Sequence, residues 1–205
     1  MNLNHIFNTA KPYPEYRQLV DELISQGKTT GNNQEQMLID FTKLNVQRMN
    51  RIDKTVQIPE ELKQQLIDLD ISYDLLLIGD AWCGDCAQII PVIQKIVESS
   101  EGKLNYKIIS RDTFPDLMEA YSTNGAKSVP KLLIMKKDHF DVIATWGPRP
   151  KPAQEIMLHW KANQDTISWE DFEKNLHLWY AKDKGLIIMH EITNLLVAIK
   201  SKMEV

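Results

Sequence analysis

Apolar residues recur at helical spacing through the N-terminal part of the chain. In residues 14–27 they stand at i, i+3, i+4, i+7 and i+8, which builds one apolar stripe between Pro14 and Gly27. The same spacing predicts two more helices, in residues 33–53 and 59–69. Isolated amphipathic helices gain most of their stability from packing. We therefore expect these helices to lie against a core formed later in the chain.

The central part of the chain alternates strand and helix patterns. Residues 72–79 form a short, continuously apolar run, which is typical of a strand covered on both faces. The strands predicted after it are 104–110, 131–137 and 141–146. The last two are close enough to form a hairpin. With helices predicted after Cys83 and across 114–121, the expected order is β-α-β-α-β-β.

The C-terminal part returns to helical spacing. The helices predicted there cover residues 152–163, 168–185 and 186–202. Ser168 is the expected N-cap of the second one, and Gly185 is expected to end or bend it. No low-complexity linker interrupts the chain, so we expect one α/β domain, residues 1–205. Its predicted parts are a helical N-terminal extension (1–71), a core (72–163) and a helical C-terminal extension (164–205).

The composition of the chain indicates an ordinary globular protein but does not indicate which reaction it carries out. The chain has 205 residues, of which 43% are hydrophobic and 25% charged, as in ordinary globular domains. A net charge of −4 gives no reason to expect a nucleic acid or an anionic membrane as partner. No secretory signal is visible at the N-terminus, and the apolar runs are too short to cross a bilayer. We therefore expect a cytoplasmic location.

The two cysteines of the chain, Cys83 and Cys86, stand two residues apart. A permanent disulfide is not expected in a reducing compartment, which leaves metal binding or dithiol chemistry. A structural zinc needs about four thiolate or imidazole ligands. The histidines of this chain are scattered and form no close second pair, so no metal site is predicted.

The position of the cysteines favours redox chemistry. A predicted buried strand runs into Trp82, and a helix is predicted to begin at Cys83. The unpaired N–H groups and the dipole of a helix start favour negative charge on the Cys83 sulfur, and the thiolate is the nucleophile. Cys86 lies about one turn further on, where we expect it to be more buried and able to close a disulfide with Cys83. Gly84 is expected to let a substrate approach closely.

These residues resemble the thioredoxin superfamily. The resemblance rests first on Trp82-Cys83-Gly84-Asp85-Cys86, followed by Pro91 within the helix. A second match is the segment 124–130, NGAKSVP, which resembles the segment that ends in a cis-proline before an antiparallel strand. A third is Gly147, which is similar to the glycine that closes the family's substrate groove. The resemblance covers roughly residues 73–161 and leaves both helical extensions unexplained.

The resemblance implies a fold and a set of site residues. The fold is thioredoxin-like, a central mixed four-stranded sheet in the order β-α-β-α-β-β-α, with helices added at both ends. The implied catalytic residues are Cys83 and Cys86. The implied substrate-binding residues are Trp82, Gly84, Asp85, Val129, Pro130 and Gly147. A cis bond between Val129 and Pro130 is predicted, with the Val129 backbone free to pair with an extended substrate.

Two departures from the family pattern concern the protons and charges near the thiols. Thioredoxins carry a buried aspartate six positions before the first cysteine, where this chain has Leu77. The residue between the cysteines that is usually proline is Asp85, whose carboxylate should oppose a thiolate beside it. Asp80, Asp85 and Arg149 are therefore the candidates for tuning the pKa of the thiols.

Each candidate also has a purely structural interpretation. The cysteines are inert thiols in that interpretation, and Pro130 only opens a strand. Trp82 fills the core, and Arg149 is a solvated surface cation, which is the interpretation that we favour for it. Asp80 and Asp85 carry the same ambiguity. The aromatic residues of the C-terminal helices, which are Trp160, Trp169, Phe172 and Trp179, are expected to be packing anchors.

The leading functional hypothesis is a thiol–disulfide oxidoreductase. Cys83 would attack a protein disulfide, and Cys86 would resolve the mixed disulfide. The expected partners are disulfide-containing proteins and an external reductant or reductase, and no metal or organic cofactor is expected. The alternative is a thioredoxin-fold adaptor that binds proteins with little redox turnover. The absence of an aspartate at Leu77 is the feature that keeps this alternative open.

Overall fold

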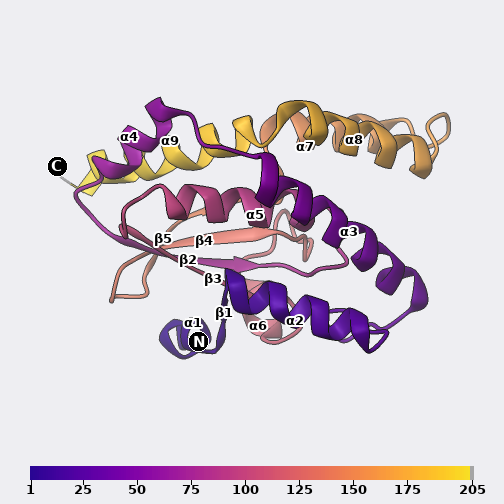
Figure 1. Ribbon diagram of the computed structural model, residues 1–205, viewed down its shortest axis with the longest axis horizontal. Coiled ribbons are helices and arrows are strands. Elements are labelled where there is room, and N and C mark those ends of the chain that lie inside the picture. Colours follow the sequence, from indigo (N-terminus) through magenta and orange to yellow (C-terminus); the bar gives the residue numbers. More distant parts are fainter. Residues whose placement is uncertain (204–205) are drawn as a thin grey trace.

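The computed structural model describes the backbone of residues 1–203 and the side chains of residues 1–199. Within residues 1–203 the sheet has five strands in the order β1-β3-β2-β4-β5 (Figure 1). The central strand β2, Tyr73–Ile78, is buried along its whole length. It pairs in parallel with β3, Leu104–Ile109, and antiparallel with β4, Lys131–Lys136. This mixed arrangement is the one that the sequence predicts for the core.

The two edges of the sheet differ in how far the sequence predicts them. At one edge, β5 (Val142–Trp146) forms the expected antiparallel hairpin with β4. At the other edge, β1 (Lys11–Pro12) pairs antiparallel with β3, and it was not predicted. Two residues are too few for an alternating pattern, and a proline is tolerated there because the strand lies at an edge.

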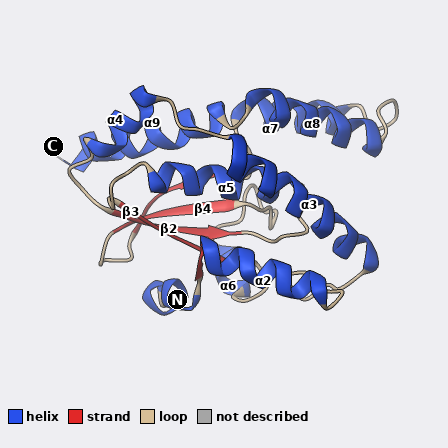
Figure 2. Cartoon of the chain, viewed as in Figure 1, coloured by secondary structure: helices blue, strands red, loops and turns tan. Residues whose placement is uncertain are grey.

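Helices cover both faces of the sheet (Figure 2). On one face lies α5, Gly84–Glu98, whose apolar side chains are buried nearly all round. The helix α3, Gln36–Thr55, packs against it on the side away from the sheet. The opposite face carries α2 (Tyr13–Ser25) and α6 (Pro115–Ala120). A helix that is hydrophobic all round needs cover on every side, and α5 obtains it from the sheet below and from helices above.

The remaining helices add to the layer above α5. They are α4 (Glu60–Ile67), α7 (Lys151–Ala162), α8 (Trp169–Asp183) and α9 (Leu186–Met203). The short helix α1 (Leu3–Thr9) is not part of this layer and lies on the other side of the sheet. The hydroxyl of Ser168 accepts a hydrogen bond from the Asp171 N–H at 3.0 Å, which caps α8 as predicted. Between α8 and α9, Lys184 and Gly185 have φ angles of 55° and 81°, and there the helical path bends.

One cluster of buried hydrophobic side chains joins all parts of the chain. It includes Val20 and Met49 from the N-terminal helices, Leu76 from β2, and Leu176 and Ile192 from the C-terminal helices. This continuity supports the prediction of a single domain, because domains are defined by a core of their own. No helix among residues 1–203 is both long and apolar enough to span a bilayer.

Candidate active site

Cys83 lies where β2 leads into α5. It is the N-cap residue of α5, with an extended backbone, and its N–H donates to the Asp80 carbonyl at 3.1 Å. The side chain is partly exposed, and both thiols of the chain are free. Cys83 thus stands at the start of the helix, although its side chain makes no capping hydrogen bond to the first N–H groups of α5.

Cys86 has a different environment one turn further along α5. Its side chain is 0% exposed. Burial raises the pKa of the Cys86 thiol well above its ordinary value, and the neighbouring Cys83 adds to the effect. Leu77 packs at the same place, since a Cβ at Gly79 would meet both the Leu77 side chain and the Cys86 sulfur within 3 Å. Cys86 is therefore held as a neutral thiol among apolar groups.

The segment before β4 lies against Cys83. The Val129–Pro130 bond is cis, the isomer that the sequence predicts. The Cys83 thiol lies 3.5 Å from the Val129 carbonyl oxygen, a distance for a weak hydrogen bond. This contact differs from the expectation that the Val129 backbone is wholly free for a substrate, because its carbonyl already faces the thiol.

Gly147 follows β5 and touches the same segment. Its φ angle is +106°, and a Cβ there would lie 2.6 Å from the Pro130 carbonyl oxygen. Only glycine allows both this conformation and this approach of two backbones. The Gly147–Pro148 bond is also cis, which the sequence did not predict.

A cavity of about 400 Å³ opens at Cys83. Its lining includes Trp82, Gly84, Asp85 and Val129 of the predicted substrate-binding residues. Pro130 and Gly147 lie behind this surface and do not line the cavity. The structure thus brings the predicted residues together around the thiol, in two layers.

Helices from both extensions form another part of the cavity wall. Their contributions are Leu38, Phe41 and Arg48 from α3, and Trp169, Phe172, Glu173, Leu176 and His177 from α8. The space beside Gly84 is occupied by the His177 ring and the Arg48 guanidinium, at 2.8 Å and 3.3 Å from where a Cβ would stand. These two side chains crowd Gly84, but Gly84 still lines the cavity, so the approach of a substrate over Gly84 stays a prediction. A side chain at position 84 would collide with His177, so the packing of His177 requires a glycine there.

Asp85 is buried and paired. Its carboxylate accepts a hydrogen bond from the Tyr180 hydroxyl at 2.7 Å and lies 2.5 Å from Nη2 of Arg149. Burial raises the pKa of Asp85, and the charge of Arg149 works against that rise. The Arg149 side chain is only 15% exposed, so the interpretation as a solvated cation is wrong. A buried carboxylate is stabilised by a cation close to it. The local sequence around Arg149, with a proline on either side, did not predict that Arg149 would pair with Asp85.

Asp80 is also buried, on the sheet side of the thiols. Burial raises the pKa of its carboxyl, while hydrogen bonds from Ser110 and Thr30 lower it. The negative charge of Asp80 adds to the raised pKa of Cys86, so the two groups are electrostatic neighbours. Asp80 is therefore a buried acid near Cys86, whereas position 77, where thioredoxins have an aspartate, is a leucine.

His177 is a site residue that sequence reasoning missed. Its Nδ1 lies 3.2 Å from the Gln88 amide nitrogen. Burial lowers the pKa of His177 to about 3, and the charges of Arg48, Arg51 and Arg149 contribute. The imidazole is therefore neutral at physiological pH. No local signal marked it, because a histidine on a helix face gains this position only through the packing of α8 over α5.

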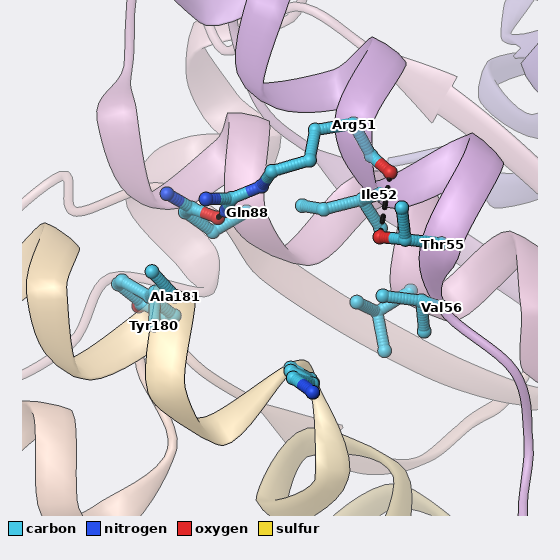
Figure 3. A pocket seen from close by; sticks show the side chains of 10 residues that line it. Arg51, Ile52, Thr55, Val56, Gln88, Tyr180 and Ala181 are labelled. Atoms are coloured by element: carbon cyan, nitrogen blue, oxygen red, sulfur yellow. Dashed lines mark hydrogen bonds between the residues drawn. The ribbon is translucent and has the colours of Figure 1, made fainter.

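A second cavity, of about 280 Å³, lies between α3, α5 and α8 (Figure 3). Arg51 and Gln88 approach each other across it, with Nη2 of Arg51 3.2 Å from Oε1 of Gln88. Tyr180 lines it too, so this cavity lies behind the Asp85 pair and has no cysteine in its lining. Among the described residues no group of three or more histidine, cysteine or acidic side chains is placed to hold a metal ion.

Comparisons with known proteins agree with this geometry. The family model described as Thioredoxin matches residues 31–167. Thioredoxin 1 of a Nostoc species is 29% identical over 98 residues, which are 47% of this chain and 88% of that protein. A thioredoxin of Porphyra purpurea is 31% identical over 98 residues, covering 47% of this chain and 86% of its own length. These relatives support a thioredoxin-like redox role in general terms.

A solved structure resembles the whole fold. The crystal structure of a Pseudomonas aeruginosa protein of unknown function has a TM-score of 0.57 and 17% identity, and the alignment covers 89% of this chain and 97% of that one. At this identity the likeness concerns the fold alone. The family match begins before α3 and ends before α8, so it reaches further towards the N-terminus than the residues 73–161 that carry the resemblance.

Proposed function

Because this chain belongs to the thioredoxin family, we propose that it is a thiol–disulfide oxidoreductase that works through Cys83 and Cys86. The observation that carries the proposal is the contrast between the two thiols. Cys83 is partly exposed at a helix start and lines a cavity, whereas Cys86 is buried one turn away. That is the arrangement needed for one attacking and one resolving thiol.

The reaction transfers two electrons from the dithiol to a disulfide. The Cys83 thiolate attacks one sulfur of the substrate, forms a mixed disulfide and releases the other sulfur as a thiolate. Cys86 then loses its proton and attacks the Cys83 sulfur. The Cys83–Cys86 disulfide forms, and the reduced substrate leaves. An external dithiol or reductase must return both electrons, and the relatives suggest protein disulfides as the general substrate class.

The other site residues have supporting roles in this proposal. Trp82 and Val129 form the wall on which the substrate lies, while Pro130 and Gly147 fix the backbone behind that wall. Asp80 tunes the pKa of Cys86 through its charge. Asp85 and Arg149 form a nearly neutral pair, so their net effect on a thiolate is smaller than that of either charge alone.

Reduction of insulin with dithiothreitol as the final reductant tests the activity. We expect the protein to accelerate insulin precipitation and the Cys83→Ser variant to be no faster than dithiothreitol alone. Cys86→Ser lacks the resolving thiol and should accumulate mixed disulfides with client proteins in a cell extract. Wild-type protein unable to exceed the rate of the Cys83→Ser variant would contradict the proposal.

The adaptor hypothesis makes the opposite prediction for the same experiments. The observation that favours it is the complete burial of Cys86 beside Leu77, a position that offers no acid. An adaptor would bind partners equally well as wild type and as a Cys83→Ser/Cys86→Ser double variant. Trapping by Cys86→Ser at the level of that double variant would therefore favour the adaptor. The single domain and the cytoplasmic location stay predictions.

A further inference from the structure

The charge of the cavity at Cys83 is opposite to the charge of the protein. Its lining contains four cationic side chains and two acidic ones, whereas the chain as a whole carries a net charge of −4. The lining cations are Arg48, Arg111, Lys127 and Arg149. They come from four separate segments of the chain and converge only in the folded structure. Clefts lined by one sign of charge concentrate ligands of the other sign.

The cations differ in how far they are neutralised. Arg149 is paired with Asp85, and Lys127 reaches the exposed Glu119 at 2.9 Å. Arg48 donates to the side-chain amide of Asn45 at 2.8 Å rather than to a carboxylate. The Glu173 carboxylate in the same lining is an electrostatic neighbour of Arg48, but no ion pair joins the two among the described residues, so the charge of Arg48 is only partly offset.

Arg111 and Trp82 form a platform on the other side of the thiol. The Arg111 guanidinium lies over the Trp82 ring, 4.6 Å from its centre, and it forms an ion pair with Asp112 at 3.4 Å. A cation held on an aromatic face keeps its planar donors in a fixed position. Arg48, beside Gly84, and Arg111, over Trp82, thus place positive charge next to both chain neighbours of Cys83.

The size of the cavity is that of a small-molecule site. Its volume of about 400 Å³ falls within the range of 300–1,000 Å³ that is usual for such sites. The helices α3 and α8 stand on either side, and the His177 ring fills the space over Gly84. A disulfide on a broad protein surface would have to pass between these helices before it reached the Cys83 sulfur.

We propose that this site prefers a small disulfide that carries carboxylates, with Arg48 and Arg111 binding the carboxylates on either side of Cys83. The inference rests on the proposed function and names its substrate class. Cys83 attacks one sulfur and expels the first small thiolate, and Cys86 attacks the Cys83 sulfur and expels the second. Two small thiols and one protein disulfide are formed for each small disulfide consumed. An external dithiol reduces the protein again.

A charge series of small disulfides tests the proposal without any external reductant. Pre-reduced protein is mixed with dianionic dithiodipropionate, neutral hydroxyethyl disulfide, dicationic cystamine or insulin. Loss of the two thiols is followed by acid quench and mass spectrometry. Each rate constant is divided by that of free dithiothreitol with the same disulfide, which removes intrinsic reactivity. We expect the dianion to be faster than the dication by about tenfold or more at low salt, with the neutral compound between them, and the span to shrink as salt is added.

Matched variants locate the preference. Arg48→Gln should narrow the ratio of dianion to neutral rates by roughly threefold to tenfold. Lys54→Gln removes a cation from an exposed position on the same helix outside the cavity, and it should leave that ratio unchanged. Glu173→Gln removes an acid from the lining and should widen the ratio.

The possible outcomes separate this inference from the proposed function. Equal normalised rates for the three small disulfides, or a faster reaction with insulin than with the dianion, would overturn the charge preference and leave the oxidoreductase intact. An equal response to Arg48→Gln and Lys54→Gln would assign the preference to the overall field of the protein and overturn this site. If no disulfide oxidised the wild-type dithiol, the proposed function itself would fail and this inference with it.

Discussion

The two walls of the cavity at Cys83 are built in different ways. The core wall consists of the junction between β2 and α5 and of the segment before β4, and its geometry is set by backbone. There the Cys83 thiol faces a backbone carbonyl, and the Pro130 carbonyl touches Gly147. The helical wall consists of α3 and α8, and it contributes side chains: Arg48, Phe172, Glu173 and His177.

This difference separates the chemistry of the site from its selectivity. A wall fixed by backbone tolerates few sequences, and the core wall lies inside the residues 31–167 that match the thioredoxin family. In the helical wall, α3 also lies inside that match, whereas α8 begins after the match ends, at Trp169. The buried Asp85, bonded to Tyr180 of α8 and to Arg149 of the core, ties the two walls together. We therefore expect changes in the core wall to stop the reaction and changes in the helical wall to alter what reacts.

The largest expected effect concerns the two thiols of the core wall. Iodoacetamide should modify Cys83 faster than Cys86 in the native reduced protein by about a thousandfold, because Cys86 reacts only after local opening and its pKa is raised by burial. Mass spectrometry of timed samples measures both rates. In the variants Cys83→Ser and Cys86→Ser only one thiol remains, so the rate of each thiol can be measured separately. Equal rates would mean that the helix start does not distinguish them.

The next effect concerns the link between the walls. Arg149→Met leaves the buried Asp85 carboxylate without its cation, which should lower the free energy of unfolding by about 3–5 kcal/mol. Urea denaturation measures the loss. The double variant Asp85→Asn/Arg149→Met should recover much of it, because no buried charge remains.

An exposed ion pair provides the control for that prediction. Lys43 pairs with Asp40 on the surface of α3, with half of the lysine side chain exposed, and Lys43→Met should leave stability unchanged within error. A similar small change for Arg149→Met would contradict the prediction that Arg149 neutralises a buried Asp85 carboxylate.

A smaller effect tests whether backbone contact defines the core wall. Gly125→Ala should cost about 1–2 kcal/mol, because the φ angle of Gly125 is +76° but nothing lies within 4 Å of the added Cβ. Gly147→Ala should cost about 3 kcal/mol or more, since its Cβ would also overlap the Pro130 carbonyl. Denaturant midpoints compare the two variants. A cost for Gly147→Ala no greater than that for Gly125→Ala would contradict the close approach.

The effect that is smallest near neutral pH belongs to the helical wall, and it grows only as the pH falls. The pKa of His177 is about 3 in the folded protein and has the ordinary value of about 6.5 in the unfolded chain. Between these values the unfolded chain binds more protons. The contribution of His177 is therefore complete above about pH 6.5 and is lost as the pH falls, with a slope of at most about 1.4 kcal/mol per pH unit.

The variant His177→Gln isolates this contribution from the many carboxyl groups that titrate in the same range. Stability measured by urea denaturation at several pH values should fall less steeply for His177→Gln than for the wild type between pH 6.5 and pH 3. The charges that face His177 are the cations Arg48, Arg51 and Arg149, and their ionisation does not change over this range. Parallel pH profiles of the two proteins would show that His177 is not buried as a neutral base.

The elements of the core were predictable because each has a local cause. A continuous apolar run predicted β2, and helical spacing with Ser168 as N-cap predicted α8. The strand β1 was missed because two residues carry no period. The proposed pair of thiols was visible for the same local reason, since the end of an apolar strand and the start of a helix adjoin in the sequence.

The partners of Asp85, Arg149 and Gly84 were not predictable from neighbouring residues. Asp85 and Tyr180 are 95 positions apart, and the bond between them exists only because α8 packs over α5. The sequence by itself determined the strands β2 to β5, most of the helices and a thiol at a helix start, because periodicity, capping and backbone restriction act over a few residues. Only the tertiary structure decided that α3 and α8 close over Cys83, that Asp85 pairs with Arg149, and that cations gather in an acidic protein. Those features depend on which distant side chains share one volume, and no local pattern encodes that choice.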